Sequence, residues 1–264
     1  MTHAIETREL LLQFGSLVAV NRISFDVAGG SIFGLLGSNG AGKSTTIKML
    51  TTLLRPSGGT ATVAGFDIVK QPRDVRRHIG YVPQMLSADG ALTGHENLKL
   101  SARLYGIPSA ETPARIGEAL ELLELAESAH RLVKTYSGGM IRRLELAQAM
   151  LHRPAVLFLD EPTVGLDPVA RHTVWEHLLK LRERYGMTIL ITTHDMEEAD
   201  HLCDDIVILH KGTVAVQGKP RELKQQIGPD ASLDDVFAEY SIGGEQAGQL
   251  TETAEVRRVA RRLG

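Results

Sequence analysis

The sequence predicts an α/β fold in which a mostly parallel sheet follows an antiparallel β region and is interrupted by a helical insert. Two apolar runs, AVLFL at 155–159 and TILIT at 188–192, flank a helical pattern at 168–186, which is typical of a parallel strand–helix–strand unit. Residues 5–36 instead alternate short apolar runs with Gly and Asn turns, as antiparallel strands do. From about residue 96 to residue 152, apolar residues recur at spacings of three and four, which indicates helices.

Composition narrows the class of protein. The 264 residues are 43% hydrophobic, which is enough for a buried core, and the net charge of −3 lacks the basic excess of a general nucleic-acid binder. No nucleic acid is therefore expected as a partner. The single cysteine, Cys203, excludes an internal disulfide framework. Because the chain starts without a basic and apolar leader and has no apolar run of bilayer length, we expect a soluble, intracellular protein.

The first part of the chain predicts a buried strand, a glycine loop and a helix in direct succession. The strand at 31–36 leads into the loop, and the helix at 42–54 is ended by Pro56 and the glycines after it. Two more strands are expected at 61–68 and 78–84.

Amphipathic helices are expected at 96–106, 114–127 and 138–151. The last begins with Ser137 as its N-cap. Its apolar positions are Met140, Ile141, Leu144, Ala147 and Leu151, and the polar residues between them are Arg142, Arg143, Glu145 and Gln148. A capping box would place Glu or Gln at position 140, so Met140 leaves the first amides of this helix open to an anion.

The last part of the chain predicts a hairpin at 205–218, with its turn at Lys211–Gly212, and a weakly structured tail after about residue 228. The tail ends in a basic stretch that either contacts anionic lipid or stays a solvated, disordered segment. Its cations are Arg257, Arg258, Arg261 and Arg262. The expected domains are a core at 1–84 and 153–227 with its β subdomain, a helical subdomain at 85–152, and a partly flexible C-terminal extension at 228–264.

The strongest motif is GSNGAGKST, which matches G-x-x-x-x-G-K-[ST] between a predicted strand and a predicted helix. Its glycines let backbone amides close around phosphate oxygens, and the helix dipole favours the anion. Lys43 is expected to neutralise the β- and γ-phosphates, and the Ser44 hydroxyl to bind Mg²⁺. The nucleotide-binding residues are Gly37, Ser38, Asn39, Gly40, Ala41, Gly42, Lys43, Ser44 and Thr45. A flexible glycine turn is the alternative, which this context disfavours.

Two acids, Asp160 and Glu161, follow the apolar strand at 155–159, at the edge where α/β sheets hold ligands. A carboxylate there can hold Mg²⁺, and the acid beside it can orient or deprotonate an attacking water. The alternative is that both acids are only the polar start of a loop.

Three other polar residues each allow two interpretations. His194 leaves a predicted strand and either reaches the γ-phosphate or only precedes a capping box of Asp195 and Glu198. Gln84 is either functional or a turn residue. Asp167 is explained well as the N-cap of the helix that follows it.

Six motifs in this order, GSNGAGKST, YVPQ, YSGGM, FLDEP, GLD and TTHD, resemble the ATP-binding cassette of ABC transporters over about residues 5–220. The resemblance implies a P-loop nucleoside-triphosphatase core. It also implies that Gln84 lies at the hinge of the helical insert, touches the metal or its water and senses a membrane partner. The implied catalytic residues are Glu161 as general base, His194 as γ-phosphate switch, Lys43 and Gln84, and the implied metal ligands are Ser44, Gln84 and Asp160.

The resemblance also assigns residues that act across a dimer. Ser137, Gly138 and Gly139 match the signature motif that contacts the ATP of the other subunit, and Asp167 lies in a loop that crosses between subunits. Met140 stands where the commonest signature has Gln, so no role is carried over to its side chain. Phe14 matches the aromatic residue that stacks on adenine, although a core Phe is the alternative.

The YSGGM form and the segment SLDDVFAEY resemble the bacterial ABC-2-type exporters, which include the daunorubicin-resistance ATPases. This implies an ATPase that exports drugs, antibiotics or lipid-like molecules, works with Mg²⁺ as a dimer around two ATP, and drives a separate permease from the cytoplasmic side of the membrane. The alternative is a soluble ABC-type ATPase acting on DNA or ribosomes. The compact insert between Gln84 and Ser137 and the single cassette disfavour it. A monomeric P-loop kinase would leave the SGG helix unexplained.

Overall fold

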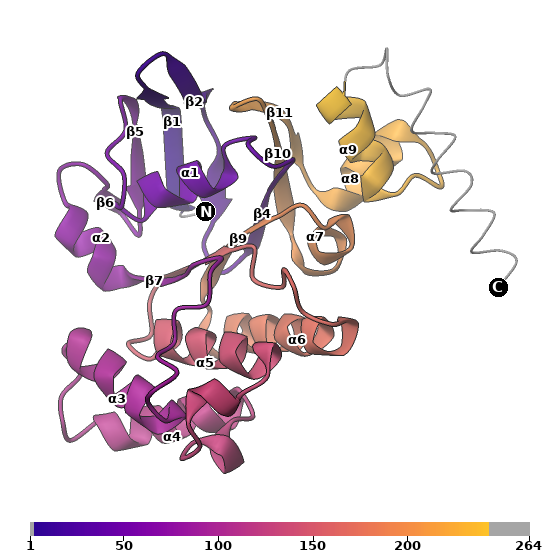
Figure 1. The fold of residues 1–264 in the computed structure, drawn as a ribbon. Coiled ribbons are helices and arrows are strands. Elements are labelled where there is room, and N and C mark those ends of the chain that lie inside the picture. Colours follow the sequence, from indigo (N-terminus) through magenta and orange to yellow (C-terminus); the bar gives the residue numbers. More distant parts are fainter. Residues whose placement is uncertain (1–2, 243–264) are drawn as a thin grey trace, which may run out of the picture.

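The computed structural model describes residues 3–242 and contains two sheets (Figure 1). The basic segment at 257–262 lies outside the described residues. The first sheet is antiparallel, in the order β2-β1-β5-β6, and β3 pairs with β1. Its strands are β1 (His3–Phe14), β2 (Leu17–Ile23), β3 (Asp26–Ala28), β5 (Gly58–Val63) and β6 (Phe66–Asp67). This confirms the predicted antiparallel β region.

The second sheet has six strands in the order β11-β10-β4-β9-β8-β7 and is parallel except for the β10–β11 hairpin. Its strands are β4 (Ile32–Gly37), β7 (Ile79–Val82), β8 (Val156–Asp160), β9 (Thr188–Thr193), β10 (Asp205–His210) and β11 (Thr213–Gly218). The predicted α/β class is therefore confirmed. Because β4, β9 and β8 are parallel neighbours, the segments that follow them meet at one edge of the sheet.

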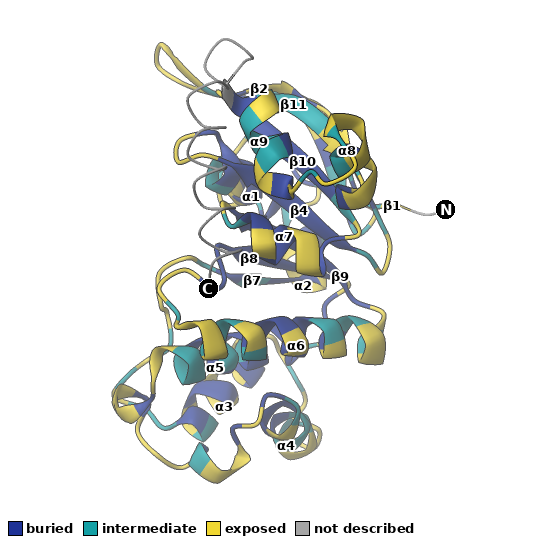
Figure 2. Ribbon diagram, turned by 90° about the vertical axis from the view of Figure 1, so that its right-hand side faces the viewer, coloured by how far each residue is buried: buried dark blue, intermediate teal, exposed yellow. Residues whose placement is uncertain are grey.

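Helices cover the sheets on separate sides. In both views α3 to α6 form the lower half, and α1, α2, α7, α8 and α9 lie beside the sheets in the upper half (Figures 1 and 2). The helices are α1 (Lys43–Leu50), α2 (Pro72–His78), α3 (Gly94–Leu104), α4 (Thr112–Leu122), α5 (Gly138–Met150), α6 (Pro168–Tyr185), α7 (Met196–Leu202), α8 (Pro220–Ile227) and α9 (Leu233–Ile242).

The six-stranded sheet separates two buried clusters, and β4 contributes to both. Ile32 and Leu36 pack with the helices of the lower half, whereas Phe33 and Leu35 pack with the antiparallel sheet and α1, which is the alternation expected of a strand buried on both faces. Buried residues of α3, α4 and α5 share one cluster with the sheet and α6. The division of the chain into domains therefore stays a prediction.

Several elements differ from the prediction. The strand expected at 61–68 is a hairpin, because Ala64 and Gly65 turn the chain with φ of 51° and 83°. Helix α4 ends before residue 127, and Glu124 has a φ of 55°. The tail is not weakly structured throughout, since α9 buries Leu233 and Val236. Helix α2 was not predicted because its seven residues hold one buried apolar side chain, too few for a periodic pattern.

Candidate functional site

The phosphate loop connects β4 to α1, as predicted. Gly40 and Gly42 have φ of 81° and 104°, a region that suits glycine, and a Cβ on Gly42 would lie 2.8 Å from the carbonyl oxygen of Ala19 on β2. Gly42 is the N-cap of α1 and offers no side chain to the first amides of the helix. The loop therefore leaves those amides to an external anion.

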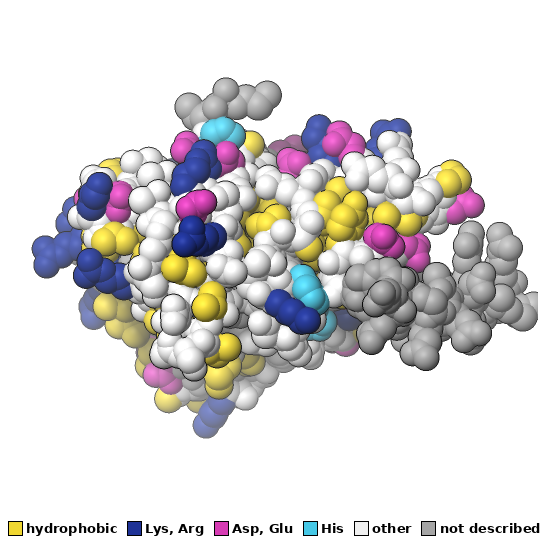
Figure 3. Space-filling model, turned by 90° about the horizontal axis from the view of Figure 1, so that it is seen from above, with side chains coloured by type: hydrophobic (Ala, Val, Ile, Leu, Met, Phe, Trp, Pro, Cys, Tyr) yellow, Lys and Arg dark blue, Asp and Glu magenta, His cyan; other side chains and the backbone are white. Residues whose placement is uncertain are grey.

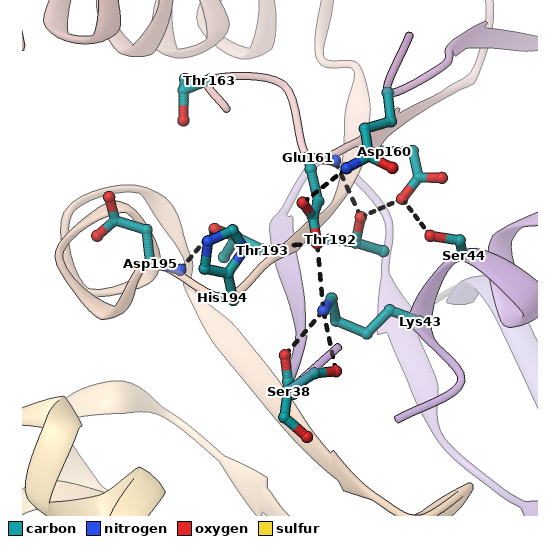
Figure 4. Close-up of polar contacts among 12 residues, drawn as sticks. Ser38, Lys43, Ser44, Asp160, Glu161, Thr163, Thr192, Thr193, His194 and Asp195 are labelled. Carbon is teal, nitrogen blue, oxygen red and sulfur yellow. Dashed lines mark hydrogen bonds and ion pairs between the residues drawn. The ribbon is translucent and has the colours of Figure 1, made fainter. Parts of the chain in front are cut away.

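Lys43 lies buried at the start of α1 and faces the loop (Figure 4). Its Nζ donates to the carbonyl oxygens of Gly37 at 2.7 Å and Ser38 at 3.3 Å. The same nitrogen forms an ion pair with Glu161 Oε1 at 3.2 Å. The ammonium group therefore lies between the loop and the Glu161 carboxylate.

Ser44, Asp160 and Thr192 form a chain of oxygen atoms beside the loop. The Ser44 hydroxyl donates to Asp160 Oδ1 at 2.9 Å, and the Thr192 hydroxyl donates to the same oxygen at 2.6 Å. Residues 3–242 contain no group of three or more His, Cys, Asp or Glu that would hold a metal unaided. One hydroxyl and one carboxylate do suit Mg²⁺, which takes few protein ligands and completes its shell with water and nucleotide phosphates.

Sequence reasoning missed Thr192. Its signal was its position near the end of the strand that pairs with β8, where it lies opposite Asp160 in the register. Tyr81, on β7, was also missed. Burial and the charge of Asp160 raise the pKa of Tyr81 to about 12.

Glu161 receives contacts from three of the predicted residues. Besides Lys43, Gln84 Nε2 donates to Glu161 Oε2 at 3.1 Å, and His194 Nδ1 lies 3.4 Å from Oε1. The Gln84 side-chain amide therefore contacts Glu161 and not the predicted metal ligands Ser44 and Asp160. The backbone of Glu161 has a φ of 49°, and its N–H donates to the carbonyl and hydroxyl oxygens of Thr192.

The predicted capping box after His194 is only half present. Asp195 caps α7 by accepting from the backbone N–H groups of Glu197 and Glu198, but its own N–H donates to Thr193 Oγ1. The Glu198 side chain turns into the core instead. There it accepts from Thr163 Oγ1 at 2.7 Å and Trp175 Nε1 at 2.9 Å.

The buried position of Glu198 has an electrostatic consequence. Burial raises the pKa of this carboxyl, against hydrogen bonds that lower it. Through Thr163 and the α7 backbone, Glu198 joins the segment after Glu161 to the helix after His194. His194 borders the cap of α7 and also contacts Glu161, and its contact with a γ-phosphate stays a prediction.

The signature residues lie away from this site. Ser137 caps α5 by accepting from the Met140 N–H at 3.2 Å, and Asp167 caps α6 by accepting from the Ala170 N–H at 2.9 Å. The two helix starts touch, because a Cβ on Gly139 would lie 2.9 Å from the Ala170 Cβ. Ser137, Gly138 and Asp167 are exposed.

The same chain does not bring the signature residues to its own phosphate loop. Within residues 3–242, no hydrogen bond or ion pair joins Ser137 to Lys43, Ser44 or Asp160, and Figures 1 and 2 place α1 and α5 in opposite halves. Phe14 ends β1 and is 49% exposed, so it is not a core residue.

Three comparisons place these features among known proteins. The ABC transporter family profile matches residues 20–164. Daunorubicin/doxorubicin resistance ATP-binding protein DrrA of Streptomyces peucetius is 46% identical over 86% of this chain and 68% of that protein. Nod factor export ATP-binding protein I of Burkholderia lata is 44% identical over 93% of this chain and 84% of that protein. A solved structure of an ATP binding subunit of an ABC transporter superposes with a TM-score of 0.80 at 32% identity, over 90% of this chain and 99% of that chain.

Proposed function

The chain belongs to the ABC transporter family, and from this premise we propose that it is the ATP-hydrolysing subunit of a bacterial ABC-2-type exporter that acts as a dimer on a separate permease. One observation carries the ATPase assignment. Lys43, Gln84 and His194 converge on the Glu161 carboxylate, next to the Ser44–Asp160 pair and the open amides of α1. The names of two relatives, a daunorubicin/doxorubicin resistance protein and a Nod factor export protein, support drugs or antibiotics as exported cargo. Lipid-like molecules are proposed from the sequence resemblance alone.

The proposed chemistry is the transfer of the γ-phosphoryl group of ATP to water. Lys43 would hold the β- and γ-phosphates, while Ser44 and Asp160 would hold Mg²⁺. The metal, when bound, neutralises charge on the phosphate oxygens. Glu161 accepts the proton of the attacking water as the new P–O bond forms and the bond to the ADP oxygen breaks. His194 and Gln84 orient the γ-phosphate and the carboxylate.

The proposed dimer follows from the separated signature residues. Ser137–Gly139 lie at the start of the 13-residue helix α5, which has no acid in its first turn, and Asp167 lies exposed nearby. A helix start of this kind suits phosphate. Because the phosphate loop of the same chain lies away from this helix start, we infer that Ser137–Gly139 contact the ATP held by Lys43 of a second copy.

The permease is proposed to dock on the surface that runs from Gln84 to Tyr105. The exposed apolar side chains there are Met85, Leu86, Leu100, Leu104 and Tyr105. Two hollows, of about 320 and 810 Å³, adjoin this surface, and both are lined by Leu104 and Tyr105. Among residues 3–242 no helix is long and apolar enough to cross a membrane, so the proposal assigns that task to the permease.

The lining of the larger hollow is rich in positively charged side chains. Arg73, Arg76 and Arg77 of α2 line it together with Arg115 of α4, and Glu111, which pairs with Arg115, is the acid in this lining. Seen from above, Lys and Arg side chains gather at the edge where Figure 1 draws β6 and α2 (Figure 3). A permease segment with carboxylates beside apolar residues would complement this surface.

The experiment that tests the function uses the chain purified alone and with the membrane protein encoded beside its gene. We expect phosphate release from ATP that requires Mg²⁺ and stops on chelation, and that rises several-fold when both proteins are reconstituted in lipid vesicles. No phosphate release under either condition would contradict the ATPase. Stimulation by DNA or ribosomes, with none by the permease, would favour a soluble ABC-type ATPase instead.

Phe14 provides a separate test of nucleotide binding. It lies at the tip of the β1–β2 hairpin, whose second strand packs against the phosphate loop at Gly42. We expect Phe14→Ala to raise the Kd for ATP about tenfold, since stacking on a base is worth about 1–3 kcal/mol. Phe14→Trp should keep the affinity. Fluorescent-nucleotide titration measures both.

The control for Phe14 is Leu17→Ala, which removes another exposed apolar side chain of the same hairpin and should leave the Kd unchanged. Inorganic triphosphate, which has no base, should bind Phe14→Ala and the unmodified protein equally. A loss of triphosphate affinity would show that the substitution damages the loop rather than an adenine contact.

A further inference from the structure

Helix α5 buries two opposite charges that the sequence pattern assigns to its polar face. Arg142 and Glu145 are 2% and 3% exposed, and Arg142 Nη1 lies 3.0 Å from Glu145 Oε2. Burial lowers the pKa of Arg142, against the charge of Glu145, which raises it. A buried ion pair commonly adds less stability than apolar side chains of similar volume. Packing alone therefore does not explain why this pair lies here.

Both residues also hydrogen-bond to one short segment, the residues that follow β7. Arg142 donates from Nη1 to the carbonyl oxygen of Pro83 at 2.8 Å and from Nη2 to that of Gln84 at 2.9 Å. Glu145 Oε1 accepts from the Ser87 backbone N–H and from the Ser87 hydroxyl at 3.1 Å. The pair thus holds the segment 83–87 at both of its ends.

The strand before this segment is also packed closely against α5. A Cβ on Gly80 of β7 would lie 2.3 Å from the carbonyl oxygen of Ala149, so only glycine permits this approach of strand and helix. The backbone of β7 and the segment 83–87 therefore lie along α5 from its end toward its middle.

The held segment faces two ways. The Gln84 side chain turns inward and donates to Glu161, while Met85 and Leu86 are 82% and 50% exposed in the proposed docking surface. On the other side of the pair, Ser137 caps the start of α5, about 7.5 Å along the helix axis from Arg142. One rigid helix thus connects the inward contact, the outward surface and the signature residues.

We propose that Arg142 and Glu145 are positioning residues that fix the segment 83–87 to the helix carrying Ser137, so that a permease bound at Met85 and Leu86 moves Gln84 and Ser137 as one body. The inference rests on the proposed function, because it takes Gln84 as part of an ATP-hydrolysing site. It assigns no contact with ATP to either residue. Their effect on hydrolysis passes through Gln84.

The test is a double-mutant cycle between the pair and Gln84. The variant Arg142→Met with Glu145→Leu fills similar volume without leaving a buried charge unpaired, but it cannot bind the three backbone groups. We expect its kcat to fall about tenfold because the Gln84 amide is displaced, and its KM for ATP to stay within about twofold because Lys43 and Ser44 are untouched. Hydrogen exchange at the Ser87 amide should become faster.

The decisive comparison is the same double substitution in a Gln84→Ala background. There we expect no further loss of kcat beyond about twofold, since residues that act through a shared partner are not additive. Full additivity of the two losses would overturn the inference, because the pair would then act by another route.

A matched control separates positioning from general damage to α5. Arg143, the next residue, also binds backbone carbonyls, those of Leu123 and Glu124, but on the α4 side. Arg143→Met should retain near-normal kcat, and an equal loss there would overturn the inference.

If the unmodified chain hydrolyses ATP and the Arg142/Glu145 variant matches it, this inference fails while the proposed function stands. If the unmodified chain hydrolyses none, the proposed function fails first.

Discussion

Replacing Glu161 by glutamine is expected to lower kcat for ATP hydrolysis by about 100-fold or more, because the amide keeps the shape of the side chain but cannot accept the proton of the attacking water. The site should otherwise persist. Lys43 keeps its hydrogen bonds to the carbonyl oxygens of Gly37 and Ser38. Asp160 keeps the hydrogen bonds that it accepts from the hydroxyls of Ser44 and Thr192. Since the substitution also removes the charge that competes with phosphate for Lys43, the affinity for ATP should not fall.

Three measurements check this result. Single-turnover phosphate release gives the chemical step, nucleotide titration gives the Kd, and light scattering with ATP gives the mass. The variant is expected to accumulate as an ATP-bound dimer, because the step that separates the subunits is slowed. Glu197→Gln is the control, since Glu197 is an exposed acid at the start of α7 and should leave turnover intact. Near-normal turnover of Glu161→Gln would remove Glu161 from the role of base.

Mixing two inactive chains is expected to restore hydrolysis. One chain carries Ser137→Arg, which places a large cation at an exposed helix start, and the other carries Lys43→Ala. In a mixed dimer, one composite site then combines an intact Lys43 with an intact Ser137, while the other site has lost both. With independent sites, a mixed dimer isolated by two different affinity tags should show about half of the turnover of the unmodified dimer.

The control for the mixing experiment places both substitutions on one chain and pairs it with an unmodified chain. Each composite site then lacks one element, so this mixed dimer should show only background turnover. It contains the same substitutions in the same number, and the difference between the two dimers therefore reports geometry alone. Equal turnover of the two mixed dimers, or none in either, would contradict a phosphate contact made across subunits.

Much of the site could be predicted because it depends on local order. Asp160 ends the apolar strand β8, and Lys43 and Ser44 begin α1 after the short loop that follows the apolar strand β4. Parallel strands of one sheet bring these ends to the same edge. The helix starts at Ser137 and Asp167 were likewise local, since a capping side chain is read from the residues next to it.

The contacts that could not be predicted are those made across long intervals by polar side chains in the core. A polar residue between apolar ones suggests an exposed face, yet Arg142 and Glu145 are buried because the segment 83–87 supplies them with partners. Glu198 is likewise buried because Thr163 and Trp175 donate hydrogen bonds to its carboxylate. Helix α9 was missed because its buried side chains depend on α8 and β10 for a surface to pack on.

The backbone of Glu161 adopts a left-handed conformation that favours glycine over residues with a Cβ. Among the non-glycine residues of 3–242 with positive φ, Glu161 is the one whose side chain belongs to the site. A left-handed conformation costs a residue with a Cβ about 1 kcal/mol relative to glycine. Exchanging this acid for glycine would remove that strain, but it would leave the buried Lys43 ammonium without its carboxylate partner, which costs more than the strain does. A search for variants with higher thermal stability and intact activity should therefore leave position 161 unchanged.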